Sequence, residues 1–212
     1  MNNPRLIPAK EAQAEFRVSN STFISTAVPA YSVEDAKKAI HRIKKKYQDA
    51  THNVPVYIIG HPPSVIEHSN DDGEPAGTAG RPALSVLRGS GFGDIAIVIT
   101  RYFGGTKLGT GGLVRAYSDA VRSVLDILPK AQKIATVTTE ITIPYSVYEQ
   151  VKRFASTHEG IIEDPIFEAD IQLKIRFQEE QFPKFQNAIT QLTNGQITPQ
   201  IISSNPNDIV DL

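Results

Sequence analysis

The 212-residue sequence contains no cysteine, and its longest uninterrupted apolar run, Ile95 to Ile99, covers little more than one helical turn. The absence of cysteine excludes a disulfide scaffold, a thiolate zinc site and a cysteine nucleophile. A membrane-spanning helix needs about 20 apolar residues, so this run is far too short to cross a bilayer. The first residues lead into no apolar segment of signal-peptide length. We therefore expect a cytoplasmic protein with no membrane partner.

The sequence also lacks an excess of charge of either sign, because 22 Lys and Arg stand against 23 Asp and Glu, a formal net charge of −1. This total excludes a uniformly basic protein of the histone type. The two parts of the chain nevertheless differ. Residues 1–130 hold 16 basic and 12 acidic side chains (+4), whereas residues 131–212 hold 6 and 11 (−5). A polyanionic partner is therefore compatible with the first part.

Hydrophobic periodicity predicts an α+β first domain over residues 1–130. Residues 12–28 carry β-branched and aromatic residues on both sides of Ser19-Asn20-Ser21, which is typical of a hairpin. Apolar residues at spacings of three and four predict helices over 33–48 and 113–128, and buried strands are expected over 54–59 and 95–99. The segment 60–93 is rich in glycine and proline, and we expect irregular structure there.

The remaining residues, 131–212, predict a second and smaller domain, with the boundary near residues 129–133. A capping box from Ser146 to Glu149 begins a helix that ends near His158, and Gly160 is expected to adopt the left-handed conformation after it. The order β-α-β-β-α-β is the ferredoxin-like signature. The expected strands are 137–143, 161–168, 170–177 and 197–202, and the second helix is 180–193.

The first stretch that suggests chemistry is HSNDDGEPAGTAGRP, from His68 to Pro82. Asp71, Asp72 and Glu74 are close enough in sequence to ligate Mg²⁺ or to act as acid and base, and His52 is a further conditional acid or metal candidate. Asp and Thr side chains also stabilise tight turns by accepting hydrogen bonds from nearby amides. The sequence therefore allows either a reactive cluster or a structural turn.

The second stretch is RYFGGTKLGTGGLVRAY, from Arg101 to Tyr117, between a predicted buried strand and a predicted helix. Glycines allow backbone amides to turn towards an anion, and a helix N-terminus adds roughly half a positive charge. The stretch matches neither the P-loop nor the dinucleotide fingerprint. Close packing alone also explains some glycine-rich connections. The anion-binding candidates are Arg101, Gly104, Gly105, Lys107, Gly109, Gly111, Gly112 and Arg115.

These two stretches, together with Ala50-Thr-His52, resemble the signature of the IMPACT family in its bacterial, YigZ-like two-domain form. The resemblance covers residues of about 15 to 128. It implies a two-layer α/β first domain, similar to the second domain of a small-subunit ribosomal protein. It also implies a ferredoxin-like second domain, similar to the last domain of elongation factor G. Eukaryotic relatives are translational regulators, so the resemblance implies a link to ribosomes, translation factors or RNA.

Three functions are compatible with this sequence. The leading hypothesis is a translation-associated regulatory protein that binds RNA, the ribosome or another phosphate-bearing ligand, with the acidic domain limiting nonspecific contacts or docking a protein. The alternative is an enzyme acting on a phosphorylated small molecule, with Asp71, Asp72 or Glu74 as metal ligand or general base. Only this alternative calls for a cofactor, Mg²⁺. A third hypothesis is a protein-docking surface around Tyr102 and Phe103.

Overall fold

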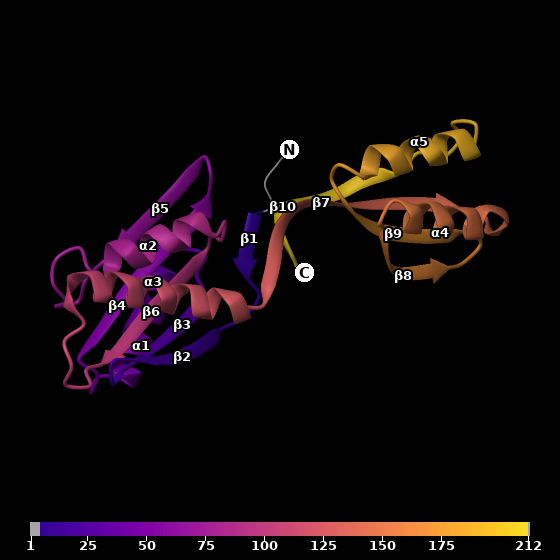
Figure 1. The fold of residues 1–212 in the computed structure, drawn as a ribbon. Coiled ribbons are helices and arrows are strands. Elements are labelled where there is room, and N and C mark those ends of the chain that lie inside the picture. The colour runs from indigo at the N-terminus through magenta and orange to yellow at the C-terminus, as the bar shows by residue number, and fades with distance from the viewer. Residues whose placement is uncertain (1–4, 212) are drawn as a thin grey trace. The chain divides into compact units, whose positions relative to one another are not determined.

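The computed structural model describes residues 5–211, which divide into two compact units (Figure 1). The first comprises residues up to Gln132 together with Val210 and Asp211, and the second runs from Lys133 to Ile209. The outer ends of the two predicted domains, residues 1–4 and 212, lie outside the described residues. β7 (Lys130–Ile143) begins in the first unit and continues into the second. The short β1 (Arg5–Pro8) also pairs with β7.

The first unit is built on a five-stranded antiparallel sheet in the order β2-β3-β6-β4-β5. β6 is the central strand, and Ile95 to Ile99 are buried on both faces of the sheet, as the continuous apolar run predicts. The predicted hairpin forms, with Ser19 and Asn20 at positive φ in its turn. The strands are β2 (Ala12–Val18), β3 (Ser21–Pro29), β4 (His52–His61), β5 (Ser64–Ser69) and β6 (Ile95–Tyr102).

Helices cover both faces of this sheet. Ile97 points into a core closed by α2 (Gly80–Gly89) and α3 (Gly109–Ile127), whereas Val98 points into a second core closed by α1 (Val33–Lys46). Successive side chains of a strand face opposite sides, so each interior strand supplies both cores. The first unit is therefore an α+β domain, as the sequence predicts, with helices packed on both faces of its sheet.

The prediction of irregular structure over residues 60–93 was wrong, because this segment contains β5 and α2. β5 pairs with β4 only, and most of its residues are exposed or half-buried, so no apolar alternation marks it. α2 has glycine at both ends and Pro82 in its first turn, where proline is tolerated. These residues are typical of loops when the sequence is considered without its tertiary contacts.

The second unit is ferredoxin-like. Its strand order is β10-β7-β9-β8, and α4 and α5 pack against β7 and β9 through Val151, Phe185 and Ile189. None of the helices in residues 5–211 is long and apolar enough to cross a membrane. Besides β7, the unit contains η1 (Tyr145–Val147), α4 (Tyr148–Thr157), β8 (Ile161–Phe167), β9 (Ile171–Gln178), α5 (Phe182–Leu192) and β10 (Gln200–Asp211).

The ends of α4 differ from the sequence prediction. Ser146 lies in the 3₁₀ turn, and the residue that caps α4 is Val147, so the predicted capping box does not form. After the helix, Glu159 rather than Gly160 has a positive φ. Gly160 is required for another reason, because a Cβ there would lie 2.3 Å from the Phe177 ring. The last strand begins at Gln200, three residues later than predicted.

Candidate functional site

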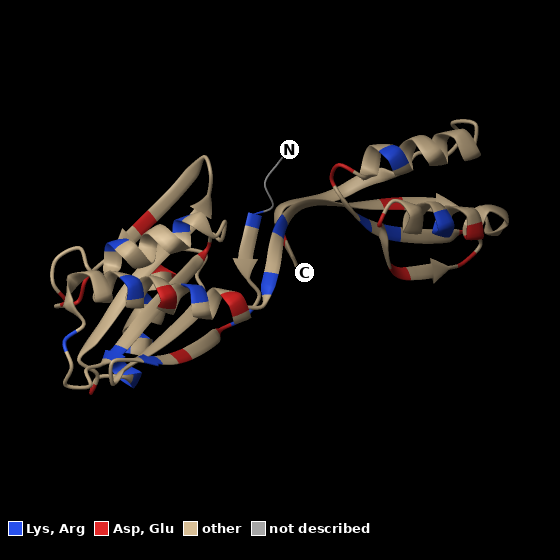
Figure 2. Cartoon of the chain, viewed as in Figure 1, with Lys and Arg blue, Asp and Glu red and all other residues tan. Residues whose placement is uncertain are grey.

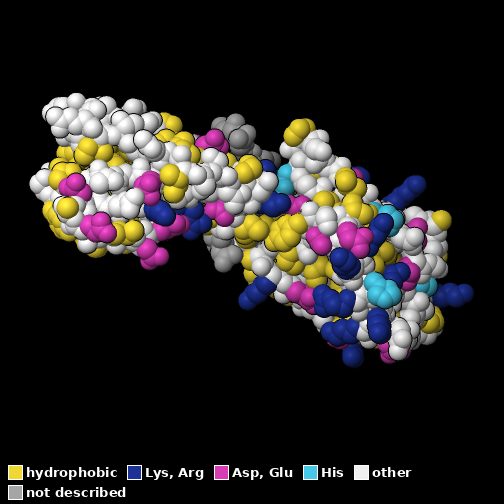
Figure 3. All heavy atoms as spheres, turned by 180° about the vertical axis from the view of Figure 1, so that it is seen from behind, with side chains coloured by type: hydrophobic (Ala, Val, Ile, Leu, Met, Phe, Trp, Pro, Cys, Tyr) yellow, Lys and Arg dark blue, Asp and Glu magenta, His cyan; other side chains and the backbone are white. Residues whose placement is uncertain are grey.

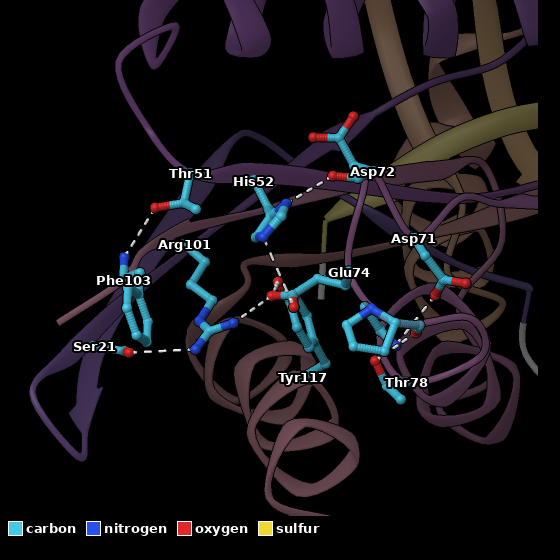
Figure 4. A network of polar contacts seen from close by, with 12 residues as sticks. Ser21, Thr51, His52, Asp71, Asp72, Glu74, Thr78, Arg101, Phe103 and Tyr117 are labelled. Carbon is cyan, nitrogen blue, oxygen red and sulfur yellow. Dashed lines mark hydrogen bonds and ion pairs between the residues drawn. The ribbon is translucent and has the colours of Figure 1, made fainter. Parts of the chain in front are cut away.

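A buried ion pair joins the two sequence motifs of the first unit. Arg101, at the end of β6, donates from Nη1 to Oε1 of Glu74 across 2.6 Å (Figure 4). Glu74 lies in the turn between β5 and α2, and the two residues are only 5% and 8% exposed. Because its charge is matched by Glu74, Arg101 does not present a free positive charge to an anion.

Tyr117 of α3 is a third member of this buried cluster and contacts Glu74. Its hydroxyl donates to the same Glu74 oxygen at 2.7 Å, and the ring is fully buried against Phe23. Burial, together with the hydrogen bond to Glu74, raises the pKa of the Tyr117 phenol far above its ordinary value. Tyr117 therefore stays protonated and acts as a hydrogen-bond donor to Glu74.

His52 approaches Glu74 from the start of β4. Its Nδ1 lies 2.7 Å from the carbonyl oxygen of Asp72, which only accepts hydrogen bonds, so Nδ1 carries a proton. Nε2 lies 3.8 Å from Oε2 of Glu74. The backbone contact thus orients the imidazole with Nε2 towards the carboxylate, as Figure 4 shows.

These groups line a pocket of about 440 Å³ at the N-terminal end of α3. This volume lies at the lower end of the range for small-ligand sites. The charged and polar lining includes Lys107, an exposed residue with no acidic partner within residues 5–211. The remaining lining residues are Thr51, Pro75, Phe103, Leu108, Gly109, Thr110 and Leu113, in addition to His52, Glu74 and Arg101.

The glycines of the second motif separate into different structural roles. A Cβ on Gly104 would lie 1.9 Å from the carbonyl oxygen of Asn20, so close packing requires this glycine. Gly105 and Gly109 have φ values of +87° and +71°, which favour glycine without any packing requirement. A Cβ on Gly112 would lie 3.0 Å from that of Leu108.

Gly111 has neither reason to be glycine. Its φ is not positive, and a Cβ there would meet no other described atom within 4 Å. It lies in the first turn of α3, which has no acidic residue and no side-chain cap. The amides at this helix end are therefore exposed beside open space, the arrangement that an anion requires.

The carboxylates of Asp71 and Asp72 are occupied by protein donors. Asp71 accepts from the backbone amides of Gly77, Ala79 and Gly80 at 2.7, 3.2 and 2.8 Å and so caps α2. Although burial opposes its ionisation, these hydrogen bonds outweigh the effect and lower the pKa of Asp71.

Asp72 has a φ of +48° and binds Lys44 of α1 and the Asn53 amide. Neither Asp71 nor Asp72 lines the pocket. Across residues 5–211 no group of three or more His, Asp or Glu side chains is arranged to hold a metal ion.

The other basic candidates lie outside the pocket. Arg115 is exposed on α3 and is not a lining residue. Figure 2 marks several lysine and arginine positions on the α1 ribbon, and Figure 3 shows Lys and Arg side chains gathered on the surface of the first unit. Part of the charge on α1 is paired, with Arg42 binding Glu11 at 2.6 Å and Lys44 binding Asp72. Lys38 pairs with Glu34 at 3.9 Å. The α1 surface is therefore less basic than its sequence indicates.

Sequence reasoning missed three contributors to this site. Tyr117 fits the apolar spacing of a helix, and the only signal for a polar role is that a buried tyrosine hydroxyl needs a partner. Ser21 is fully buried and lies 3.5 Å from Arg101 Nη2. Thr51 accepts a hydrogen bond from the Phe103 amide at 3.0 Å. Both residues are ordinary turn residues in the sequence.

The fold and the site define a class: a two-unit α+β protein with a small-ligand-sized pocket at a helix N-terminus of its first unit. The Impact N-terminal domain model matches residues 19–125, and a model of a domain of unknown function (DUF1949) matches residues 141–196. The chain belongs to the IMPACT family.

The similarity extends over nearly the whole chain. An IMPACT family member of Haemophilus influenzae is 32% identical over 198 residues, 93% of this chain and 96% of that protein. The IMPACT family member YvyE of Bacillus subtilis is 33% identical over 187 residues, 88% and 86% of the two chains. A crystal structure described as a hypothetical protein has a TM-score of 0.62 at 30% identity and covers 96% of this chain and 99% of its own.

Proposed function

We propose that this protein is a cytoplasmic, translation-associated regulatory protein that binds phosphates of RNA or of the ribosome at the N-terminal end of α3. Gly111 is the observation that carries the proposal, because the fold does not require a glycine there and the space beside it is open. Lys107 supplies an unpaired positive charge to the pocket at this end of α3, which Gly109 and Thr110 line and Gly111 itself does not. The family resemblance supports the link to translation.

The charge distribution is consistent with this function. Residues 1–130 carry +4 and residues 131–212 carry −5, so attraction to a polyanion is concentrated in the first unit. The acidic second unit limits nonspecific contact with nucleic acid or docks a protein partner. This uneven distribution of charge favours a protein that binds phosphates at one defined place over a protein that binds polyanions along its whole surface.

The test is RNA and ribosome pull-down with the full chain at low and high salt. Each phosphate contact to single-stranded RNA contributes about −0.7 to the slope of log affinity against log salt. We expect Lys107→Ala combined with Arg115→Ala to weaken binding and to reduce this slope. Arg122→Ala combined with Lys130→Ala serves as the control, because it removes the same formal charge from the last turns of α3 and the start of β7, away from the pocket. Binding that changes neither with salt concentration nor in the Lys107→Ala, Arg115→Ala variant contradicts the proposal.

The alternative function, catalysis on a phosphorylated small molecule, has one supporting observation. Glu74 and His52 lie beside Lys107 in a single pocket, so acid-base groups and a phosphate-binding charge are brought together. The test is phosphate release from phosphomonoesters and nucleotides, with and without Mg²⁺. Turnover that is lost in His52→Gln supports an enzyme, and no turnover by the wild-type protein under either condition contradicts it.

A further inference from the structure

The wall of the pocket carries an exposed aromatic ring. Phe103 is 45% exposed, although its backbone amide donates to the Thr51 hydroxyl and the next residue, Gly104, packs tightly against the Asn20 carbonyl. The guanidinium carbon of Arg101 lies 5.5 Å from the ring centroid. An exposed ring on a backbone anchored in this way, at the wall of a pocket, is a surface on which a flat ligand can stack.

Glu74 has an unused acceptor in the same pocket. Its Oε1 accepts two hydrogen bonds, from Arg101 and Tyr117, whereas its Oε2 accepts none from the described residues and has only His52 Nε2 at 3.8 Å. The side chain is 3% exposed. Because Glu74 lines the pocket and its Oε2 has no protein donor, this oxygen is a free acceptor that suits a ligand with an N–H group.

The pocket therefore offers three kinds of contact: a ring for stacking, an acceptor for an N–H donor and a positive end for phosphate. We propose that it binds one unstacked nucleotide. The base lies on Phe103 and donates an N–H to Glu74 Oε2, and the phosphate contacts Lys107 and the first-turn amides of α3. This inference rests on the proposed function and names the ligand unit. Unpaired bases are the part of RNA that proteins stack on aromatic side chains.

The first test compares ligands on the unmodified full chain. Calorimetric titration uses AMP, ribose 5-phosphate and the 5′-monophosphate of purine riboside, which lacks the amino group of adenosine. We expect AMP to bind roughly ten-fold more tightly than ribose 5-phosphate, because stacking is lost without the base. The purine analogue should lie between the two, because it stacks but does not donate to Glu74. Equal affinity for AMP and ribose 5-phosphate overturns the inference.

The second test changes the ring. Phe103→Leu should weaken AMP binding roughly ten-fold. Phe103→Tyr keeps an aromatic ring and should bind AMP about as tightly as the wild-type protein. Tyr145→Leu is the matched control, since Tyr145 is 54% exposed in the second unit. Unfolding curves of all variants confirm that each is folded. Unchanged AMP binding in Phe103→Leu overturns the inference and favours Phe103 as a protein-docking residue.

An unstructured adenosine-tract RNA distinguishes the source of the nucleotide and separates the two proposals. Phe103→Leu weakening both AMP and RNA indicates a nucleotide within RNA, and weakening AMP alone indicates a free nucleotide. If the change at Lys107 and Arg115 weakens RNA binding but Phe103→Leu weakens neither ligand, the proposed function stands and the inference fails. If RNA does not bind but AMP binding depends on Phe103, the nucleotide site stands and the proposed RNA-binding function fails.

Discussion

Arg101 and Glu74 form a buried ion pair, with Nη1 of the arginine donating to Oε1 of the glutamate across 2.6 Å. The pair connects the end of β6 to the turn before α2, two segments separated by 27 residues in the sequence. It places the carboxylate where Tyr117 and His52 also reach it. The same contact thus fixes the fold of the first unit and one wall of the pocket.

Removing one partner of this pair should strongly destabilise the protein. We expect Arg101→Gln to lower the free energy of unfolding by about 3–5 kcal/mol, because it leaves a buried carboxylate without its counter-charge. Glu74→Gln should have a similar effect, and the double variant should lose less than the sum of the two. Urea unfolding measures all three. If the double variant loses as much unfolding free energy as the two single variants together, Arg101 and Glu74 are not energetically coupled.

The surface pair between Arg88 and Glu67 provides the control for this experiment. It has the same residue types, but the Arg88 side chain is 59% exposed. Arg88→Gln should therefore cost far less stability than Arg101→Gln, because an exposed ion pair contributes little. A loss as large as that of Arg101→Gln contradicts the role of burial.

Tyr117→Phe should remove a pH-dependent contribution to stability. The hydroxyl donates to a charged acceptor, so its loss should cost about 2 kcal/mol at neutral pH. The folded pKa lies above the unfolded value of about 10, so this contribution is present below pH 10 and is lost as the pH rises further. The stability difference between wild type and variant, from urea unfolding, should therefore shrink in alkaline solution. A difference that is constant with pH contradicts this assignment.

Asp71→Asn tests whether this carboxylate is structural. The variant weakens the cap of α2 and should cost about 1 kcal/mol. Because the folded pKa of Asp71 is lowered, its stabilisation is present above the unfolded value of about 3.9 and is lost as the pH falls through the folded value. The stability gap between wild type and variant should therefore close in acid. RNA binding should be unchanged, and a loss of binding in a folded variant contradicts a purely structural role.

The sequence predicts elements whose burial pattern is local. The apolar run Ile95–Ile99 identifies the central strand, and the spacing from Val33 identifies α1. β5 and α2 could not be predicted in this way, since β5 is largely exposed and α2 begins at Gly80-Arg-Pro82. Their structure depends on pairing with β4 and packing on α3, which periodicity does not report.

In the candidate site, too, the sequence indicates which residues are present but not the tertiary contacts that they make. The sequence identifies Arg101, Lys107 and Glu74, which all line the pocket, but it does not show that Arg101 and Glu74 neutralise each other. A contact across 27 residues leaves no local pattern. The carboxylates of Asp71 and Asp72 resemble metal ligands in sequence because turn-forming and metal-binding carboxylates have the same composition. Only the donors around them, backbone amides and Lys44, distinguish the two roles.

Alanine substitution at two glycines of one motif should have opposite effects on stability. Gly104→Ala places a Cβ 1.9 Å from a backbone oxygen, so the hairpin turn must move and the protein should be strongly destabilised. Gly111→Ala places a Cβ in open space within a helix and should stabilise the protein by about 0.5–1 kcal/mol. Thermal or urea unfolding measures both.

The same Gly111→Ala variant separates packing from ligand binding. If the open space beside α3 receives a phosphate, the added methyl group should weaken RNA and AMP binding although the fold becomes more stable. Ser118→Ala, in the middle of the same helix, is the control for a general effect of helix stability. A Gly111→Ala protein that is more stable and binds as tightly as wild type places the phosphate elsewhere. The glycine would then have no role that the structure explains, because neither its backbone conformation nor its packing requires it.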